Sequence, residues 1–290
     1  MGVLNEEKKP LVAIVTGASS GIGKAMAKEL HSRGIRVFAG ARRLANMSEL
    51  ADLGIDVIKL DVTDQSTIDA LKELIKAQTN GKLDLLFNNA GQPNSSPCLD
   101  ITAEDAIATY DVNVFGVMRM VTTFTPMLIE SKGKIINTGS VSGVVNFPYS
   151  AVYNSSKAAL YQYSNTIRLE LKPFGVDVIH TITGGVKSNI VDTRELPNDS
   201  LFKQLALESI KSRREMSQTN QPMSAEEYSK RVLNKVLVQN PRSFVWEGSF
   251  ANIIWFLVSF FPQGILDWLL FKKFKMYILQ KNIDIKRKSK

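Results

Sequence analysis

The sequence predicts an α/β fold in which helices cover both faces of a parallel β-sheet. A short apolar run, Leu11–Val15, leads through a glycine-rich turn into a helix-forming segment at 24–33. Ile35–Ala39 then resumes as a strand and completes a βαβ unit. Strand-like and helix-like segments keep alternating along the chain, so we expect a doubly wound, Rossmann-type sheet. The later strand candidates are 57–60, 83–87, 134–138 and 176–183, and the helical candidates are 67–78, 103–130 and 153–172.

The length and composition fit one globular domain with an extension at each end. The chain has 290 residues, of which 44% are hydrophobic and 22% are charged, values that exclude a disordered or coiled-coil protein. Its lone cysteine, Cys98, excludes an internal disulfide. We therefore divide the chain into an N-terminal tail at 1–9, a single Rossmann-type domain at 10–245 and a C-terminal extension at 246–290.

The positive charge of the chain is concentrated at its C-terminus. A net charge of +8 fits nucleic acid, an anionic membrane surface or a phosphorylated ligand as partner. From Lys272 onward the chain carries eight basic residues and one acid, Asp284, so the excess nearly disappears without this tail. We therefore expect no nucleic-acid partner.

Residues 188–224 interrupt the alternating pattern. The segment is charged and irregular and contains Pro197 and Pro222. In a doubly wound fold, a segment at this position lies over the ligand crevice. We interpret it as a mobile substrate lid, with a plain surface insertion as the alternative.

A glycine-rich turn after the first strand predicts a dinucleotide site. It reads Gly17-Ala18-Ser19-Ser20-Gly21-Ile22-Gly23. In such turns the first N–H groups of the following helix point at a pyrophosphate, and a Cβ on the glycines would block its approach. A glycine-rich turn alone is weak evidence, but here a strand and a helix flank it in the required order.

Two arginines after the second strand predict NADPH as the cofactor. NAD-binding proteins of this architecture usually place an acid there to hold the ribose 2′-hydroxyl. This chain has Arg42 and Arg43 instead, which can donate bidentate hydrogen bonds to a 2′-phosphate, and Lys24 adds charge nearby. The alternative is that both arginines are merely solvated.

Two more turns are expected to face the cofactor. Asp61-Val62 follows the third strand and can place a carboxylate against the adenine amino group. Asn89-Ala90-Gly91 follows the fourth strand, and its small residues permit close backbone approach. Either could be a structural turn, but the carboxyl ends of such strands border the ligand crevice.

A tyrosine and a lysine four residues apart form the candidate catalytic group. Tyr153 and Lys157 share one face of a predicted helix, where the ammonium would lower the pKa of the phenol and make it a better proton donor near neutral pH. Ser140 can donate a hydrogen bond to a developing alkoxide. Asn113 lies in a long helical segment, where a kink could aim its amide at a water beside Lys157.

Together these motifs resemble the short-chain dehydrogenase/reductase family over residues 10–190. The resemblance implies that Tyr153 is the general acid, that Lys157 also holds the nicotinamide ribose, that Ser140 orients the carbonyl and that Asn113 anchors a relay water. It also implies nicotinamide contacts from Val186 and Ser188. The family's usual proline is absent from this turn, which reads Thr183-Gly184-Gly185-Val186-Lys187-Ser188.

Three further segments resemble members of the family that reduce a lipid ketone. They are 81–92, 182–186 and 250–253. This resemblance implies NADPH-dependent reduction of 1-acyl-dihydroxyacetone phosphate to 1-acyl-glycerol 3-phosphate, a step of phospholipid synthesis. A hydroxysteroid, a retinoid or another lipophilic ketone is the alternative substrate. Basic residues that could meet the phosphate lie in or beside the lid, and the sequence does not select among them: Lys187, Arg194, Lys203, Lys211, Arg213 and Arg214.

The C-terminal extension predicts a membrane-associating hairpin. Residues 250–271 are strongly apolar, but Pro262-Gln263-Gly264 interrupts them, so a clean membrane-spanning helix is not expected. An apolar hairpin followed by a basic tail provides two cooperating membrane signals. We expect the cytosolic face of the endoplasmic reticulum or a lipid droplet as the location. The alternative is packing into the core or a homodimer interface.

Two other functions are alternatives to a reductase. Gly17-Ala18-Ser19-Ser20-Gly21 formally matches the Gly-x-Ser-x-Gly pattern of lipid ester hydrolases. Those enzymes carry the motif further along the chain, with a downstream histidine, and this chain has only His31 and His180. A non-catalytic lipid binder would have lost part of the catalytic set, which is complete here.

Overall fold

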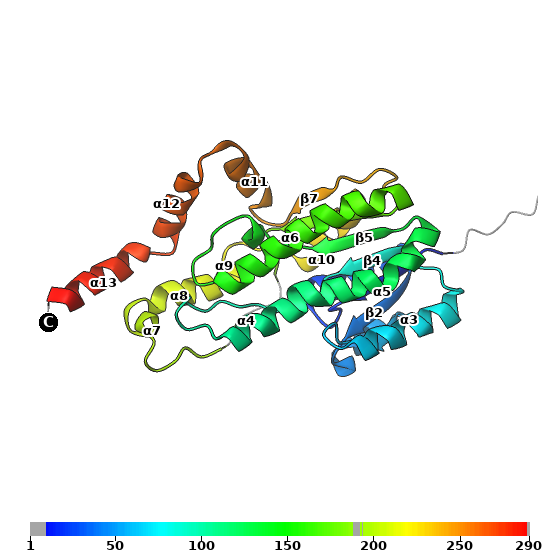
Figure 1. The fold of residues 1–290 in the computed structure, drawn as a ribbon, viewed down its shortest axis with the longest axis horizontal. Helices are drawn as coiled ribbons and strands as arrows, with labels where there is room; N and C mark the ends of the chain where they lie inside the picture. Colours follow the sequence, from blue (N-terminus) through cyan, green and yellow to red (C-terminus); the bar gives the residue numbers. More distant parts are fainter. Residues whose placement is uncertain (1–9, 188–191, 193, 289–290) are drawn as a thin grey trace, which may run out of the picture.

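The computed structural model describes residues 10–187, 192 and 194–288, and it confirms the predicted sheet (Figure 1). All neighbouring strands pair in parallel, in the seven-stranded order β3-β2-β1-β4-β5-β6-β7. The chain therefore changes direction across the sheet between β1 and β4, where a ligand crevice opens at the carboxyl ends. The strands are β1 (Val12–Thr16), β2 (Arg36–Ala41), β3 (Asp56–Lys59), β4 (Leu85–Asn88), β5 (Lys134–Thr138), β6 (Asp177–Thr183) and β7 (Phe244–Glu247).

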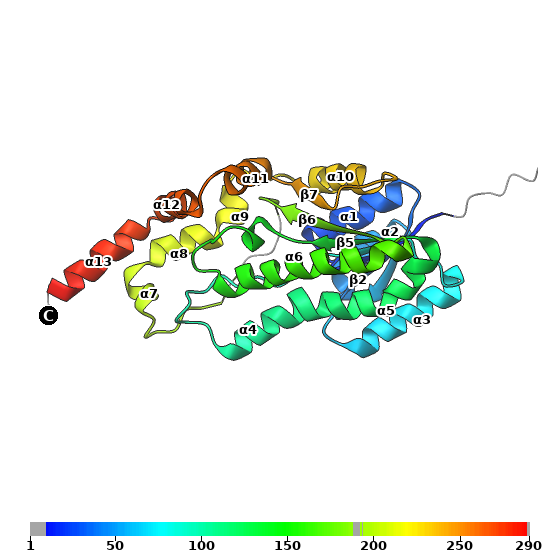
Figure 2. The same cartoon turned by 45° about the horizontal axis from the view of Figure 1, so that its top comes forward.

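Helices cover both faces of the sheet, as Figure 2 shows. The alternation of side chains along β1 explains why: Ala13 and Val15 belong to one buried cluster, whereas Val12 and Ile14 belong to the other. The first cluster lies under α1 (Gly21–Ser32), α2 (Ser48–Asp52) and α10 (Ala225–Val236). The second lies under α3 (Gln65–Thr79), α5 (Gly116–Ser131) and α6 (Ala151–Leu171). Short 3-10 helices complete the connections: η1 (Leu44–Met47), η3 (Val141–Gly143) and η4 (Lys172–Phe174).

The structure adds two elements that the sequence did not reveal. Helix α10 packs along α1, and the four-residue strand β7 pairs with β6 at the sheet edge. A strand this short, between polar segments, leaves almost no periodic signal. The predicted domain boundary at 245/246 is wrong, because it falls inside β7.

The predicted continuous helix at 103–130 is interrupted in its middle. It consists of α4 (Ala103–Tyr110), the π-helical turn η2 (Asp111–Phe115) and α5. Such π turns occur often at functional sites because they locally shift the helix face. Among the described residues, only the stretch Ala103–Ser131 is long and apolar enough to cross a membrane by length and composition, and 56% of its apolar window is buried inside the domain.

The lid segment is more regular than expected. Its described part contains α7 (Leu201–Leu205), α8 (Leu207–Arg214) and α9 (Met216–Thr219). Leu196, Ala206 and Ile210 are buried with Tyr149 in one small apolar cluster. These contacts anchor the lid segment to the domain beside the start of α6.

The C-terminal extension has the predicted helix–break–helix form. Its helices are α11 (Ala251–Phe260), α12 (Gln263–Lys273) and α13 (Met276–Lys288), and they project at the end of the molecule in Figure 1. The inner side of the extension nevertheless packs on the domain: Leu266 and Phe274 are buried with Phe147, and the rings of Phe147 and Phe274 meet edge to face at 6.3 Å.

We predict that Phe274→Ala destabilises the whole domain. Phe274 is 1% exposed, so truncating it should lower the free energy of unfolding by about 3–5 kcal/mol, measured by urea denaturation. Phe260 on α11 is 64% exposed and provides the control, because Phe260→Ala should change stability by no more than about 0.5 kcal/mol. Equal stability of both variants would show that the extension does not contribute to the core.

Candidate active site

One cavity at the carboxyl ends of the strands collects the predicted site. Its volume is about 840 Å³, enough for a dinucleotide end and a small-molecule substrate. It brings together almost every predicted cofactor and catalytic residue: Gly17, Ser19, Ser20, Gly21, Ile22, Arg42, Arg43, Asp61, Val62, Asn89, Ala90, Gly91, Ser140, Tyr153, Lys157 and Val186. Gly23 and Asn113 do not line it, and Ser188 lies outside the described residues.

The glycine turn has the backbone that a pyrophosphate site requires. Gly17 and Gly21 have φ angles of +68° and +52°, a region that favours glycine. The predicted role of Gly23 is wrong in one respect. A Cβ there would lie 2.4 Å from the carbonyl oxygen of Gly17, so the glycine permits close packing of the turn against α1 rather than approach of a ligand.

The turn after β4 is tied directly to the glycine turn. The Thr16 hydroxyl accepts hydrogen bonds from the backbone N–H groups of Asn89 and Ala90, both at 2.9 Å. The Asn89 amide also donates to the carbonyl of Thr16 at 3.1 Å. The backbone N–H and the side-chain amide of Asn89 thus both bond to Thr16, and Asn89 shapes the wall of the cofactor site.

The two arginines stand at the rim as predicted, whereas Lys24 does not contribute as expected. Arg42 and Arg43 are exposed, and within the described residues neither forms an ion pair. The Lys24 ammonium instead pairs with Glu49, and hydrogen bonds from Lys24 and Lys28 lower the pKa of that carboxyl to about 2. The positive charge available to a 2′-phosphate is therefore that of the arginines.

The Asp61 carboxylate is fixed at the same rim. Its Oδ1 accepts hydrogen bonds from the backbone N–H of Thr63 at 3.0 Å and from the Thr63 hydroxyl at 2.8 Å. These bonds hold the carboxyl group beside Val62 on the cavity wall. A dinucleotide with a 2′-phosphate fits this set of residues.

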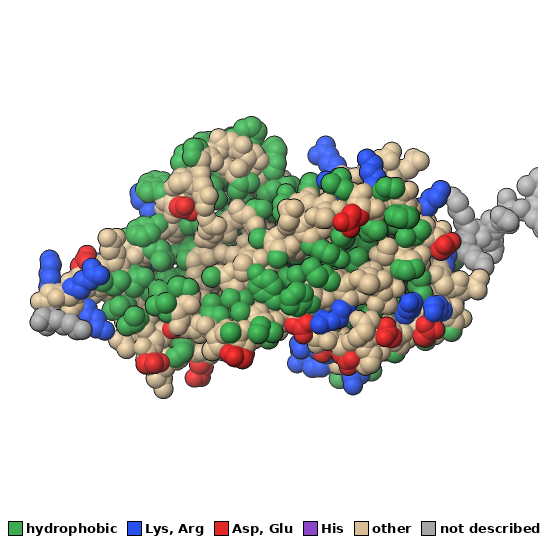
Figure 3. Space-filling view, in the orientation of Figure 1, with side chains coloured by type: hydrophobic (Ala, Val, Ile, Leu, Met, Phe, Trp, Pro, Cys, Tyr) green, Lys and Arg blue, Asp and Glu red, His purple; other side chains and the backbone are tan. Residues whose placement is uncertain are grey.

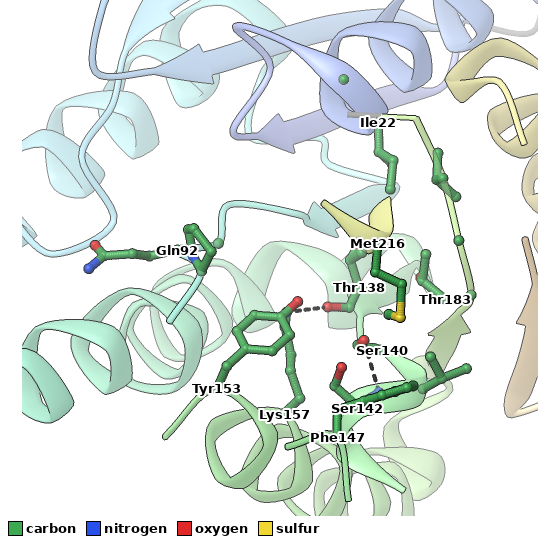
Figure 4. Close-up of a pocket in the computed structure, with 18 of the residues that line it drawn as sticks. Ile22, Gln92, Thr138, Ser140, Ser142, Phe147, Tyr153, Lys157, Thr183 and Met216 are labelled. Atoms are coloured by element: carbon green, nitrogen blue, oxygen red, sulfur yellow. Dashed lines mark hydrogen bonds between the residues drawn. The ribbon is translucent and has the colours of Figure 1, made fainter. Parts of the chain in front are cut away.

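Tyr153 and Lys157 lie side by side on α6, with Ser140 nearby (Figure 4). Lys157 is 4% exposed, its Nζ donates to the carbonyl of Thr138 at 2.9 Å, and it lies 5.9 Å from the centre of the Tyr153 ring. Burial lowers the pKa of Lys157 to about 8. The Ser140 hydroxyl accepts a hydrogen bond from the N–H of Ser142 at 3.0 Å, which orients it.

The cation that acts most on the Tyr153 phenol is not the predicted one. Burial raises the pKa of Tyr153, while hydrogen bonding with Ser140 and the charge of Arg213 lower it. Arg213 was only one of several basic lid residues in the sequence, and no spacing to Tyr153 distinguished it. Only the folding of α8 across the cavity brings it there.

Asn113 has a different contact set from the predicted one. Its amide N–H groups donate to the Gln92 carbonyl and the Ser156 hydroxyl, both at 3.0 Å, and its Oδ1 accepts from the Gln92 N–H at 2.8 Å. The amide therefore joins the π turn to α6 and to the chain after Gly91. Both amide protons thus have protein partners, and a contact of Asn113 with a relay water stays a prediction.

The arrangement does not provide the base that an ester hydrolase needs. Burial lowers the pKa of His180 to about 3, and its Nδ1 lies 3.0 Å from the Ser164 hydroxyl. Its ring packs edge to face on Tyr161. In the part of the chain that the structure describes, neither histidine is hydrogen-bonded to Ser19.

Sequence comparison agrees with this geometry. The family model for short-chain dehydrogenases matches residues 11–198, which contain the glycine turn, the Tyr153–Lys157 pair and Ser140. The chain belongs to the short-chain dehydrogenase family. The NADPH-dependent 1-acyldihydroxyacetone phosphate reductase of Saccharomyces cerevisiae is 42% identical over 96% of both chains. The short-chain dehydrogenase virD of Hypocrea virens is 40% identical over 91% of this chain and 92% of its own.

Solved structures of short-chain dehydrogenases share the fold. One from Streptomyces avermitilis superposes with a TM-score of 0.77 over 98% of this chain and 99% of its own, at 24% identity. Another, from Burkholderia cenocepacia in complex with NADP, has a TM-score of 0.72 and 26% identity, and covers 90% of this chain and 98% of its own.

We predict that the double variant Arg42→Gln, Arg43→Gln loses its preference for the phosphorylated cofactor. Hydrogen bonds to a charged group contribute about 1.5–3 kcal/mol, and exposure places these at the low end, so the Kd for NADPH should rise about tenfold. Fluorescence titration with NADPH measures this change. Titration with NADH is the internal control, and an equal loss of affinity for both would contradict the assignment.

Proposed function

We propose that this enzyme reduces the ketone of 1-acyl-dihydroxyacetone phosphate to 1-acyl-glycerol 3-phosphate. The observation that carries the proposal is the composition of the cavity that contains Tyr153. The cofactor residues and the Tyr153–Lys157 pair line it, and an apolar wall and two arginines from α8 line it as well. A phosphorylated lipid ketone has both of these features.

The cofactor is NADPH, and it supplies the hydride when bound. The arginines at the rim favour a phosphorylated cofactor. Two similar proteins support this: the Saccharomyces cerevisiae relative is named as NADPH-dependent, and the Burkholderia cenocepacia structure is a complex with NADP. Lys157 and the turn around Val186 lie where they can hold the nicotinamide end.

The chain's own residues supply the proton. As hydride reaches the ketone carbon, its C=O π electrons move to oxygen, and the Tyr153 hydroxyl transfers its proton to that oxygen to give the alcohol. Because burial raises the pKa of Tyr153, the phenol carries its proton at neutral pH, and Ser140 and Arg213, which lower this pKa, make the proton easier to release. Ser140 donates a hydrogen bond to the same oxygen, and its position on the cavity wall beside Tyr153 supports this role.

The apolar wall supports an acyl chain in the substrate. It is built by Val145 and Phe147 after β5, by Met216 on α9 and by residues of the extension: Ile253, Ile254, Leu257, Leu266, Leu269 and Leu270. An acyl chain buried there gains about 0.8 kcal/mol per CH₂ group. The Saccharomyces cerevisiae relative aligns with 96% of this chain, and its name supports the same substrate. The second candidate is another lipophilic ketone, because the same wall would accept a steroid or a retinoid.

We predict NADPH oxidation with 1-acyl-dihydroxyacetone phosphate that depends on Tyr153. Loss of the proton donor in Tyr153→Phe should lower kcat by about 10²–10⁴-fold, followed as the decrease of absorbance of NADPH. Ser19→Ala tests the hydrolase alternative and should lower kcat far less. Turnover of steroid or retinal ketones without turnover of the phosphorylated ketone would overturn the substrate. Ester cleavage that requires Ser19 while NADPH oxidation is absent would overturn the reductase.

We also propose that the extension binds the cytosolic surface of the endoplasmic reticulum or a lipid droplet. Its outer side exposes large apolar residues, which Figure 3 shows gathered on the projecting helices with few charges among them: Ile253, Trp255, Phe256, Phe260, Phe261, Ile265 and Trp268. Lys272 lies 4.0 Å above the Trp268 ring, and α13 ends in Lys286, Arg287 and Lys288. Aromatic side chains beside lysines are suited to the boundary of an anionic bilayer.

We predict that Trp255→Ser, Phe256→Ser, Phe260→Ser abolishes binding to phosphatidylserine vesicles in a flotation assay. Exposed apolar residues on α11 provide the insertion energy, so their removal should leave only weak electrostatic attraction. The control is Phe174→Ser at η4, a phenylalanine that is 56% exposed on another part of the surface. Vesicle binding that survives the triple variant would overturn the proposal. A wild-type dimer that becomes monomeric in the triple variant, without vesicle binding, would assign this surface to a second copy.

A further inference from the structure

Arg213 is a buried arginine at the substrate end of the cavity. It is the penultimate residue of α8 and is only 8% exposed, yet it lines the cavity that contains Tyr153. Its charge is close enough to lower the pKa of the Tyr153 phenol. Burial lowers the pKa of Arg213 itself to about 10, so the guanidinium is still charged at neutral pH.

No described group of the protein pairs with this charge. Within the described part of the chain, Arg213 has no ion pair and no hydrogen bond, and its Nε is buried without a partner. The guanidinium carbon lies 5.2 Å from the centre of the Phe147 ring. Arg214 beside it donates from Nε to the Ser95 carbonyl at 3.1 Å, but its buried Nη2 also lacks a partner.

The other basic residues of the lid segment are already paired. Arg194 bonds to Asp192 at 2.6 Å, Lys203 donates to Asn198 at 2.9 Å, and Lys211 lies 3.9 Å from Glu215. Asp192, an acid on the wall of the same cavity, is thereby matched by Arg194 and does not neutralise Arg213. The cavity therefore has excess positive charge near the proton donor.

Burying an unpaired guanidinium is unfavourable for stability unless something compensates for it. Arginine presents a planar set of N–H donors that matches phosphate oxygens in a bidentate way. In the substrate of the proposed function, one CH₂–O link separates the ketone carbon from the phosphorus. A group that holds the phosphate must therefore lie beside the group that protonates the ketone, which is where Arg213 is.

We propose that Arg213, with Arg214 beside it, binds the phosphate of the substrate, while the apolar wall takes the acyl chain. This inference rests on the proposed function and selects one of the basic lid residues that the sequence left open. It also fixes the direction of the substrate in the cavity. The phosphate points to α8, and the acyl chain points to α11 and α12.

Steady-state kinetics on two ketones test the proposal. The ketones are 1-acyl-dihydroxyacetone phosphate and its phosphate-free counterpart, 1-acyl-dihydroxyacetone, and the variants are Arg213→Met and Arg213→Lys. Losing one partner of a buried charge pair should lower kcat/KM of Arg213→Met for the phosphorylated ketone about thirtyfold or more, mainly through KM. Its kcat/KM for the phosphate-free ketone should change little, and Arg213→Lys should lie between the wild type and Arg213→Met for the phosphorylated ketone.

Thermal unfolding without ligand gives a second readout. Because Arg213→Met removes an uncompensated buried charge and keeps the volume, its Tm should equal or exceed that of the wild type. The matched control is Arg231→Gln, which removes an exposed arginine that pairs with Glu227 on α10 and, at 3.7 Å, with Glu247. Because Lys235 still pairs with Glu247 at 2.6 Å, kinetics and Tm should change little. If Arg213→Met does not fold, the comparison of the two ketones with Arg213→Lys decides the question.

The outcomes separate this inference from the proposed function. A wild-type enzyme that does not reduce the phosphorylated ketone overturns both. A wild type that does so, together with an Arg213→Met variant of unchanged KM, overturns only the phosphate contact. An equal loss on both ketones also overturns it and assigns Arg213 to tuning of Tyr153.

Discussion

The Thr16 hydroxyl holds the two halves of the sheet together at the point where the site opens. Threonine ends β1, and its oxygen accepts hydrogen bonds from two successive N–H groups after β4. In a doubly wound sheet this is the place where the strand order reverses, so the turns leaving β1 and β4 diverge and leave a crevice. Together with the bond from the Asn89 amide to the Thr16 carbonyl, this contact fixes the glycine turn and the Asn89–Gly91 turn relative to each other, so the two walls of the cofactor site are set together.

Buried positive charge is the second organising feature of the cavity. Lys157 is accommodated through the Thr138 carbonyl, and burial brings the pKa of its ammonium to about 8. Arg213 has no such partner among the described residues. Both cations favour anionic groups in the cavity. Their surroundings have low polarity, which makes burial of the charge unfavourable but strengthens its interaction with an anionic group. Buried positive charge therefore favours an anionic group both beside Lys157 and beside Arg213.

In the function proposed above, the extension connects the substrate cavity with the lipid surface that it would bind. Leu266 and Phe274 pack with Phe147, whose ring also lies beside the Arg213 guanidinium. The helices that expose apolar side chains on their outer side thus build the inner wall of the substrate end. A lipid that enters between α11 and α12 would move from one apolar surface to another and avoid transfer of its chain through water.

The sequence by itself determined the first six strands of the sheet, the cofactor turn and the Tyr153–Lys157 pair, because each depends on local spacing along a strand, a turn or a helix. It also located the break at Pro262, since proline interrupts a helix wherever the chain goes next. Only the tertiary structure decided the roles of Gly23, Asn113, Lys24 and Arg213. Each depends on a partner far along the chain: Gly23 meets the Asn89 side chain, Asn113 bonds to Gln92 and Ser156, Lys24 pairs with Glu49, and Arg213 faces Tyr153. Spacing cannot reveal such contacts, because they form between segments that only the folding of the whole chain brings together.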